Sequence, residues 1–347
     1  MSAAPSMIRL GRCCFFILLL GLLAGRPAYS GSLTASIAIP GGTAGIGFDD
    51  LGFSPELHKV IVPAGRTGEL VLIDPTSRKI DEVGGFSSQK DFARDHDQGV
   101  TSADFGRGAI FATDRDEKTL DVIDPHTKTI IAKTKLAAGP DYVRYIAATD
   151  EVWVTEPRAS QIEVFSLPQH GLPEPNAAGT ISIPNGPESL AIDNNRDRAY
   201  TNLWSDTTVN IDLRKHAIAA RWPNGCRGSR GIAIDRARGF LLIGCKEGKL
   251  QSLALSDGKR LGEAAGGAGV DIIAYAPKLH HAYLPGADSA TMAVIDVAAD
   301  GKPNFLAAIA TAPDAHCVIA DDIGDAYVCD PRKGRLLLFR DDAAEAR

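Results

Sequence analysis

A strand-like run that ends at a small polar turn recurs seven times along this chain. The first two copies are Leu70–Pro75 and Leu120–Pro125, and the last is Leu336–Arg340. The runs end at positions 74, 124, 166, 212, 256, 296 and 340, which are 40 to 50 residues apart. A repeat of this length indicates one small structural unit per repeat, packed against the units on either side.

Each repeat contains more than one β-rich segment. Upstream of the recurring run lies a second segment, such as Glu151–Thr155, and a third precedes that one, such as Tyr142–Ala147. A fourth segment follows the run, as in Thr129–Ala132. The chain has 35 Gly and 20 Pro in 347 residues, and Gly, Asn and Asp stand between the segments, as expected for tight turns. Each unit is therefore predicted to hold four antiparallel strands.

Seven such units predict an all-β fold, a seven-bladed β-propeller of four-stranded antiparallel blades, in a single domain over residues 31–347. Radial closure removes the exposed sheet edges that an open array would leave. The seventh unit ends near Arg340 after only three strands, so we expect Leu33–Ile39 to close the last blade as its fourth strand. The alternatives, a β-helix or a pair of β-sandwiches, do not have a sevenfold repeat of about 44 residues.

The first thirty residues have the pattern of an export signal. Arg9 and Arg12 precede the apolar run Cys13–Ala24, and Ala28-Tyr29-Ser30 follows it. This run is shorter than the roughly 20 residues needed to span a bilayer. We therefore predict a signal peptide over residues 1–30, cleaved after Ser30, and a periplasmic or secreted protein. An N-terminal anchor helix is the alternative. No later segment is expected to span a membrane.

The charge balance limits the classes of partner. The formal net charge is −6, and residues 1–30 contain three arginines and no acidic residue, so the remaining chain is near −9. An acidic protein is a poor match for nucleic-acid phosphates, so nucleic acid is an unlikely partner. Walker, G-x-S-x-G, H-E-x-x-H and C-x-x-C-H motifs are all absent from the sequence. We expect a monomer that binds a protein or small-molecule ligand.

Three segments carry a family resemblance. The turn Val122–Pro125 and the hairpin strands Glu151–Thr155 and Asp325–Cys329 resemble the repeats of exported bacterial propellers of the YVTN/YncE-like group. The resemblance covers about residues 33–340. It implies the propeller fold, in a group that includes binding modules, haem-d1 domains, quinoprotein-like subunits and lactonases. A shared fold does not by itself assign one of these functions.

Four cysteines follow the predicted cleavage point. An even number of cysteines in an oxidising compartment indicates two disulfides. Cys317 and Cys329 lie opposite each other across the hairpin turn at Asp322–Gly324. Cys245 ends the equivalent strand in the fifth blade, and Cys226 lies in the loop that enters that blade. We therefore predict the pairs Cys226–Cys245 and Cys317–Cys329.

Equivalent positions in the seven units predict a ring around one mouth of the central channel, on what we call the top face. The ring positions are Asp49, Gly99, Asp141, Glu188, Arg230, Asp271 and Ala315. Four carboxylates in a narrow funnel repel one another. We expect Arg230, a bound cation or protonation of a carboxylate to reduce this repulsion. Adding neighbouring side chains, the predicted ligand-binding residues are Asp49, Asp97, Asp141, Glu188, Trp204, Arg230, Asp271 and His316.

Two functions follow from this ring. The first is an exported propeller that binds a partner protein or a small ligand on its top face without catalysis. The alternative is a cation-dependent, lactonase-type hydrolase, in which Asp141, Glu188 and Asp271 hold Ca²⁺ or another divalent cation through their oxygens. His316 is the weak candidate for a catalytic base. A hydrated channel lined by charges without a specific role is the remaining interpretation, and no other cofactor is implied.

Overall fold

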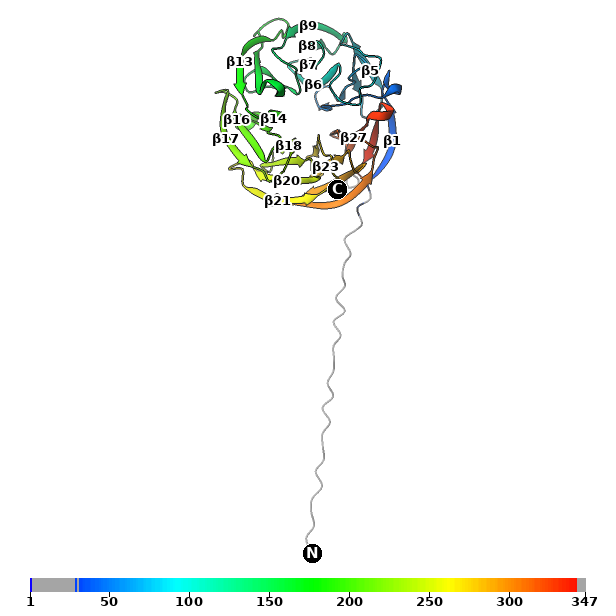
Figure 1. The fold of residues 1–347 in the computed structure, drawn as a ribbon, viewed down its shortest axis with the longest axis vertical. Coiled ribbons are helices and arrows are strands. Elements are labelled where there is room, and N and C mark those ends of the chain that lie inside the picture. The colour runs from blue at the N-terminus through cyan, green and yellow to red at the C-terminus, as the bar shows by residue number, and fades with distance from the viewer. Residues whose placement is uncertain (2–28, 30, 342–347) are drawn as a thin grey trace.

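The chain forms a wheel of seven sheets around a central axis (Figure 1). The computed structural model describes residues 1, 29 and 31–341, and within them 28 strands form seven four-stranded antiparallel sheets. The predicted fold class is confirmed. The predicted signal peptide lies outside the described residues, apart from Met1 and Tyr29. Among the described residues, no helix has the length and apolar character needed to cross a membrane.

Blades 1 to 6 each take four consecutive strands. Blades 1 and 2 comprise β2 (Gly52–Ser54), β3 (Lys59–Pro63), β4 (Glu69–Ile73), β5 (Ile80–Gly84), β6 (Val100–Gly106), β7 (Ala109–Asp114), β8 (Thr119–Asp124) and β9 (Thr129–Lys135). Blades 3 and 4 comprise β10 (Val143–Ile146), β11 (Glu151–Glu156), β12 (Gln161–Ser166), β13 (Asn176–Ser182), β14 (Glu188–Asp193), β15 (Arg198–Asn202), β16 (Thr207–Asp212) and β17 (Ala217–Pro223). Blades 5 and 6 comprise β18 (Ser229–Asp235), β19 (Phe240–Cys245), β20 (Lys249–Ala254), β21 (Arg260–Ala265), β22 (Ala274–Ala276), β23 (His281–Gly286), β24 (Thr291–Val297) and β25 (Pro303–Ala310). Short 3₁₀ turns lie at Gly42–Ala44, Pro157–Ala159, Asn194–Arg196 and Pro331–Lys333.

Blade 7 is built from both ends of the chain. It contains β26 (Val318–Ala320), β27 (Asp325–Asp330) and β28 (Arg335–Arg340), and β1 (Ser32–Ala38) is its outermost strand. β1 runs antiparallel to β28, with Ser32 opposite Arg340 and Ala38 opposite Arg335. The predicted closing strand is confirmed, shifted by one residue from the expected Leu33–Ile39.

The inner and middle strands are apolar because neighbouring blades cover both of their faces. In β3, Val60, Ile61 and Val62 are all fully or almost fully buried. Trp153 on β11 packs in one cluster with Leu190 of the next blade, so the core lies between blades as well as within them. Burial of apolar surface at each blade junction stabilises the ring as a whole.

Both predicted cysteine pairs are bonded in the structure. Cys226–Cys245 joins Cα atoms 5.3 Å apart, and Cys317–Cys329 joins Cα atoms 5.6 Å apart. The second pair closes the β26–β27 hairpin, where Val318 lies opposite Val328 as the predicted register requires.

The connection from blade 1 to blade 2 is a long loop, residues 85–99, whereas residues 183–187 suffice between blades 3 and 4. This loop accounts for the longest repeat spacing in the sequence. The buried Arg66 guanidinium donates to the carbonyl oxygens of Gln89 and Lys90 at 3.2 and 3.3 Å. Gly47 packs directly against the loop backbone, since a Cβ at this position would lie 1.7 Å from the Asp95 carbonyl oxygen. These contacts hold the loop over the top face.

Candidate functional site

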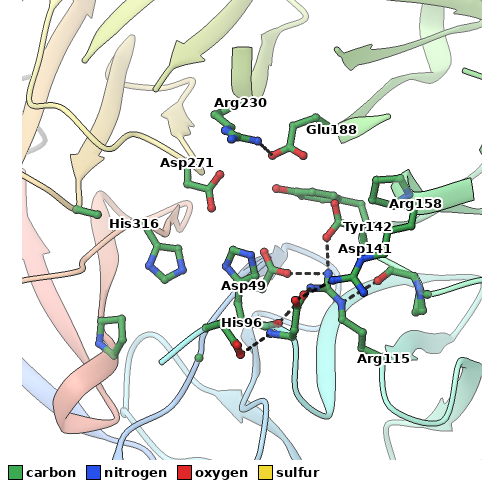
Figure 2. Close-up of a pocket in the computed structure, with 18 of the residues that line it drawn as sticks. Asp49, His96, Arg115, Asp141, Tyr142, Arg158, Glu188, Arg230, Asp271 and His316 are labelled. Atoms are coloured by element: carbon green, nitrogen blue, oxygen red, sulfur yellow. Dashed lines mark hydrogen bonds and ion pairs between the residues drawn. The ribbon is translucent and has the colours of Figure 1, made fainter. Parts of the chain in front are cut away.

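A cavity of about 1000 Å³ opens on the top face, where the connections between blades converge around the channel (Figure 2). Its walls come from the connections between blades and from turns within blades, such as those that carry Arg115 and Trp204. All the residues predicted to bind ligand line this one cavity: Asp49, Asp97, Asp141, Glu188, Trp204, Arg230, Asp271 and His316. Gly99 and Ala315, the two ring positions without a polar side chain, are not among the lining residues.

Arg115 is the centre of the charge network on one side of the cavity. Its guanidinium contacts three carboxylates: Asp49 at 3.1 Å, Asp97 at 2.5 Å, and Asp141. Burial opposes the charge of Arg115, but these three carboxylates raise its pKa. Sequence reasoning missed this residue. It directly follows β7, and its position one residue past a strand end on the top face is the signal that would have found it.

Two of the carboxylates bound to Arg115 are themselves deeply buried. Asp49 is 4% exposed and Asp141 is 8% exposed. Burial raises the pKa of each, and the charge of Arg115 acts in the opposite direction. Asp97 is more open to solvent, and there Arg115 outweighs burial and lowers the pKa. On this side of the cavity, Arg115 offsets part of the acidic repulsion, whereas the sequence led us to expect Arg230, a bound cation or protonation to do so.

Glu188 has a different set of partners across the cavity. Arg230 Nη1 lies 3.3 Å from its Oε1, and the indole N–H of Trp204 donates to its Oε2. Burial, followed by the charges of Asp141 and Asp271, raises the pKa of Glu188 to about 8. The carboxyl therefore keeps its proton to a higher pH than an exposed glutamate does. Trp204, fixed by this bond, leaves 42% of its surface exposed at the cavity.

A buried ion pair lies beneath this layer of charges. Arg144 donates to Asp50 with both terminal nitrogens, and the Ser102 hydroxyl donates to the same carboxylate at 2.6 Å. The Arg144 guanidinium lies over the ring of Tyr142, 5.3 Å from its centroid. Tyr142 itself lines the cavity, so this pair supports one of the cavity's side chains from behind.

His96, Asp271 and His316 form a third group in the same cavity. One ligand-type atom from each lies within 4.8 Å of the others, and the two imidazole centroids are 5.6 Å apart (Figure 2). His96 comes from the 85–99 loop, Asp271 from the β21–β22 connection and His316 from the β25–β26 connection. Within residues 31–341, no side chain forms a hydrogen bond or ion pair with the Asp271 carboxylate.

The carboxylates predicted to hold a metal all line the cavity, but they differ in their partners. Asp141 is bound by Arg115, and Glu188 is bound by Arg230 and Trp204. Asp271 instead lies with the two histidines. The assignment of these three acids as one metal site stays a prediction.

Comparison with known proteins supports the architecture. No family model matches the chain, and no curated protein is significantly similar to it in sequence. Several solved structures share the fold. One reported as the crystal structure of a mitotic checkpoint complex aligns with a TM-score of 0.72 at 13% identity, over 95% of this chain and 99% of that chain.

Two further structures align with similar scores. A hydrazine synthase chain from Kuenenia stuttgartiensis has a TM-score of 0.69 at 13% identity, covering 87% of this chain and 98% of its own. A structure of U3-55K has a TM-score of 0.71 at 10% identity, covering 90% and 100%. At such low identity the likeness shows the fold alone. The protein is a seven-bladed β-propeller, a fold that is a common scaffold for protein interaction.

Proposed function

We propose that this protein is an exported propeller that binds a small polar ligand in the top-face cavity. The observation that carries the proposal is the convergence of buried charged side chains around one open cavity of about 1000 Å³. A recessed site of this size suits a small molecule, with a few placed polar groups that set its orientation. A flat docking surface for a protein would not require buried Asp49 and Asp141 below the rim.

Trp204 narrows the class of ligand. Its indole edge is bound to Glu188, so the exposed ring surface is held in place beside the cavity. A fixed aromatic surface next to hydrogen-bonding groups favours a ligand with a flat ring or a sugar face. The ligand of this proposal is therefore a small polar molecule that stacks on Trp204 and forms hydrogen bonds to the charged wall.

Export belongs to the same proposal. The sequence pattern at residues 1–30 supports it, and two disulfides fit an oxidising compartment. N-terminal sequencing of the protein isolated from the cell envelope should begin at Gly31. A chain that retains residues 1–30 in the cytoplasm would contradict export.

The test of binding is native mass spectrometry of protein isolated from its own cell envelope. We expect the wild-type chain to carry a bound small molecule that is reduced or absent in Trp204→Ala. Trp222→Phe is the matched control, because Trp222 is 8% exposed and does not line the cavity. An unliganded wild-type protein, or equal occupancy in Trp204→Ala, would contradict the proposal.

Hydrolysis with a divalent cation is the second candidate, since Asp141, Glu188 and Asp271 surround one cavity. Asp141 and Glu188 are each bound to an arginine, and the pKa of Glu188 is raised, so both are weaker cation ligands than free carboxylates, which favours binding over hydrolysis. If the protein hydrolysed a lactone only with Ca²⁺ present, and Glu188→Gln abolished this activity, hydrolysis would become the favoured function.

A further inference from the structure

The cavity contains one group of metal-ligating side chains that its ion pairs leave unused. The four other carboxylates that were predicted to bind ligand are each bound to an arginine: Asp49, Asp97, Asp141 and Glu188. The Asp271 carboxylate has no such partner within residues 31–341, and it lies beside His96 and His316. The His96 ring also forms no hydrogen bond or ion pair within that range, so His96 and Asp271 remain available for a ligand, with His316 beside them.

The His316 ring is held between two backbone carbonyl groups. Its Nδ1 lies 2.7 Å from the Asp314 carbonyl oxygen, and its Nε2 lies 2.8 Å from the Phe48 carbonyl oxygen. A neutral imidazole has one N–H, so it can donate to only one carbonyl and turns a lone pair toward the other. To bind an ion at that nitrogen, the ring has to turn away from the carbonyl, because a metal–nitrogen bond of about 2.0 Å leaves no room for an ion between atoms 2.7 or 2.8 Å apart. The remaining N–H then keeps its carbonyl bond, which is the usual way a metal-binding histidine is oriented.

His96 is held in position although it lies in a long loop. Arg66 binds the loop backbone at Gln89 and Lys90, and Arg115 Nη1 donates to the His96 carbonyl oxygen at 3.2 Å. The Gln98 side chain adds a bond to the Asp91 carbonyl oxygen at 3.2 Å. A metal-binding histidine on a loop that is fixed at several points loses less conformational freedom when the metal binds.

We propose that His96, Asp271 and His316 bind a divalent first-row transition-metal ion of the Zn²⁺ type. Imidazole nitrogens favour such ions over Ca²⁺ and Mg²⁺, which prefer oxygen ligands. Three protein ligands leave a coordination position open to the cavity, as in zinc sites that bind water or substrate. The open coordination position would bind a donor atom of the small ligand. Only this last step rests on the proposed function.

The experiment is metal titration of the oxidised, chelator-treated chain without a polyhistidine tag. Co²⁺ reports nitrogen ligands through visible absorption, and displacement by Zn²⁺ gives the affinity. We expect one ion per chain, and a loss of about tenfold or more in affinity in each of His96→Ala, Asp271→Asn and His316→Ala. Should His316→Ala fail to fold, the other two variants decide the result.

Two control variants locate the ion. His170→Ala removes an exposed histidine in the β12–β13 connection, away from the cavity, and should leave the affinity unchanged. Glu188→Gln should also leave it unchanged, because Glu188 lies outside the proposed ligand set. Binding that persists in all three ligand variants would overturn the inference. Loss of metal binding in Glu188→Gln would also overturn the inference, and would instead support a metal site formed by Asp141, Glu188 and Asp271.

The outcomes separate this inference from the proposed function. An organic ligand found in the envelope-derived protein, together with no Co²⁺ or Zn²⁺ binding, would overturn the metal site and leave ligand binding standing. One bound metal per chain with no co-purifying organic ligand would support the metal site and contradict the proposed function.

Discussion

At the scale of the residue, Arg115 holds together the acidic side of the cavity. Its side chain is 12% exposed and its carboxylate partners Asp49 and Asp141 are at least as buried. Removing one partner of a buried ion pair leaves an uncompensated charge. We expect Arg115→Ala to lower the free energy of unfolding by about 3 kcal/mol or more, measured by chemical denaturation.

Arg158 provides the matched control for Arg115. It also contacts Asp97, at 3.2 Å, but its side chain is 84% exposed. An exposed ion pair contributes less than about 1 kcal/mol, so Arg158→Ala should unfold close to the wild-type midpoint. Equal losses in the two variants would show that Arg115 has no special role.

Glu188 predicts a pH dependence of stability. Its pKa is about 8 in the folded protein and near 4.5 in an unfolded chain. Between these values the unfolded state releases a proton that the folded state keeps, so stability falls as pH rises from about 5 to 8. Relative to Glu188→Gln, the wild-type free energy of unfolding should fall by on the order of a few kcal/mol across this range.

Denaturation curves at several pH values between 5 and 8 test this expectation. Glu174→Gln is the control, because Glu174 is exposed in the β12–β13 connection and its variant should follow the wild type. A constant difference between wild type and Glu188→Gln across the range would contradict the raised pKa.

At the scale of the element, β1 is the strand on which closure of the ring depends. Ile37 is 7% exposed in the cluster that joins blades 7 and 1, whereas Ser36 on the opposite face is exposed. We expect Ile37→Ala to cost about 2–4 kcal/mol of unfolding free energy, and Ser36→Ala about 0.5 kcal/mol or less. Thermal and chemical unfolding measure both, and similar small effects would mean that β1 is dispensable.

Sequence predicted these elements well because their physical causes are local. Strands such as β3, with Val60–Val62 buried on both faces, form continuous apolar runs, and the turn residues repeat at fixed intervals. A constant hairpin length also places Asp141, Glu188 and Asp271 at equivalent positions, so counting along the chain brought them to one cavity.

The pairing within the site could not be predicted in this way. Asp49 and Asp141 are paired with Arg115 because its side chain points into the cavity after β7 ends, and repeat spacing does not give that direction. The position of His96 depends on contacts between the 85–99 loop and residues distant in sequence, such as Arg66 and Gly47. Repeat spacing contains no information on a loop that occurs in only one repeat.

At the scale of the whole molecule, the surface favours a single chain in solution. The exposed large hydrophobic side chains among residues 31–341 are Leu33, Leu172, Trp204, Phe305 and Ile323. Two of them lie on strands and three in loops, whereas an obligate dimer buries a large and mostly apolar interface. We expect sedimentation to give the mass of a monomer. A dimer at micromolar concentration would show that another surface mediates association.

Arg66 connects the 85–99 loop to the segment that follows β1. The same guanidinium that binds the 85–99 loop also donates to Gly41 and Gly45, in the segment that leads out of β1. The loop bearing His96 is thus anchored on a segment whose own place depends on β1 joining β28. The wall of the cavity that bears His96 is therefore held in place only in a chain whose two ends are joined, and ligand uptake would report that the ring is closed.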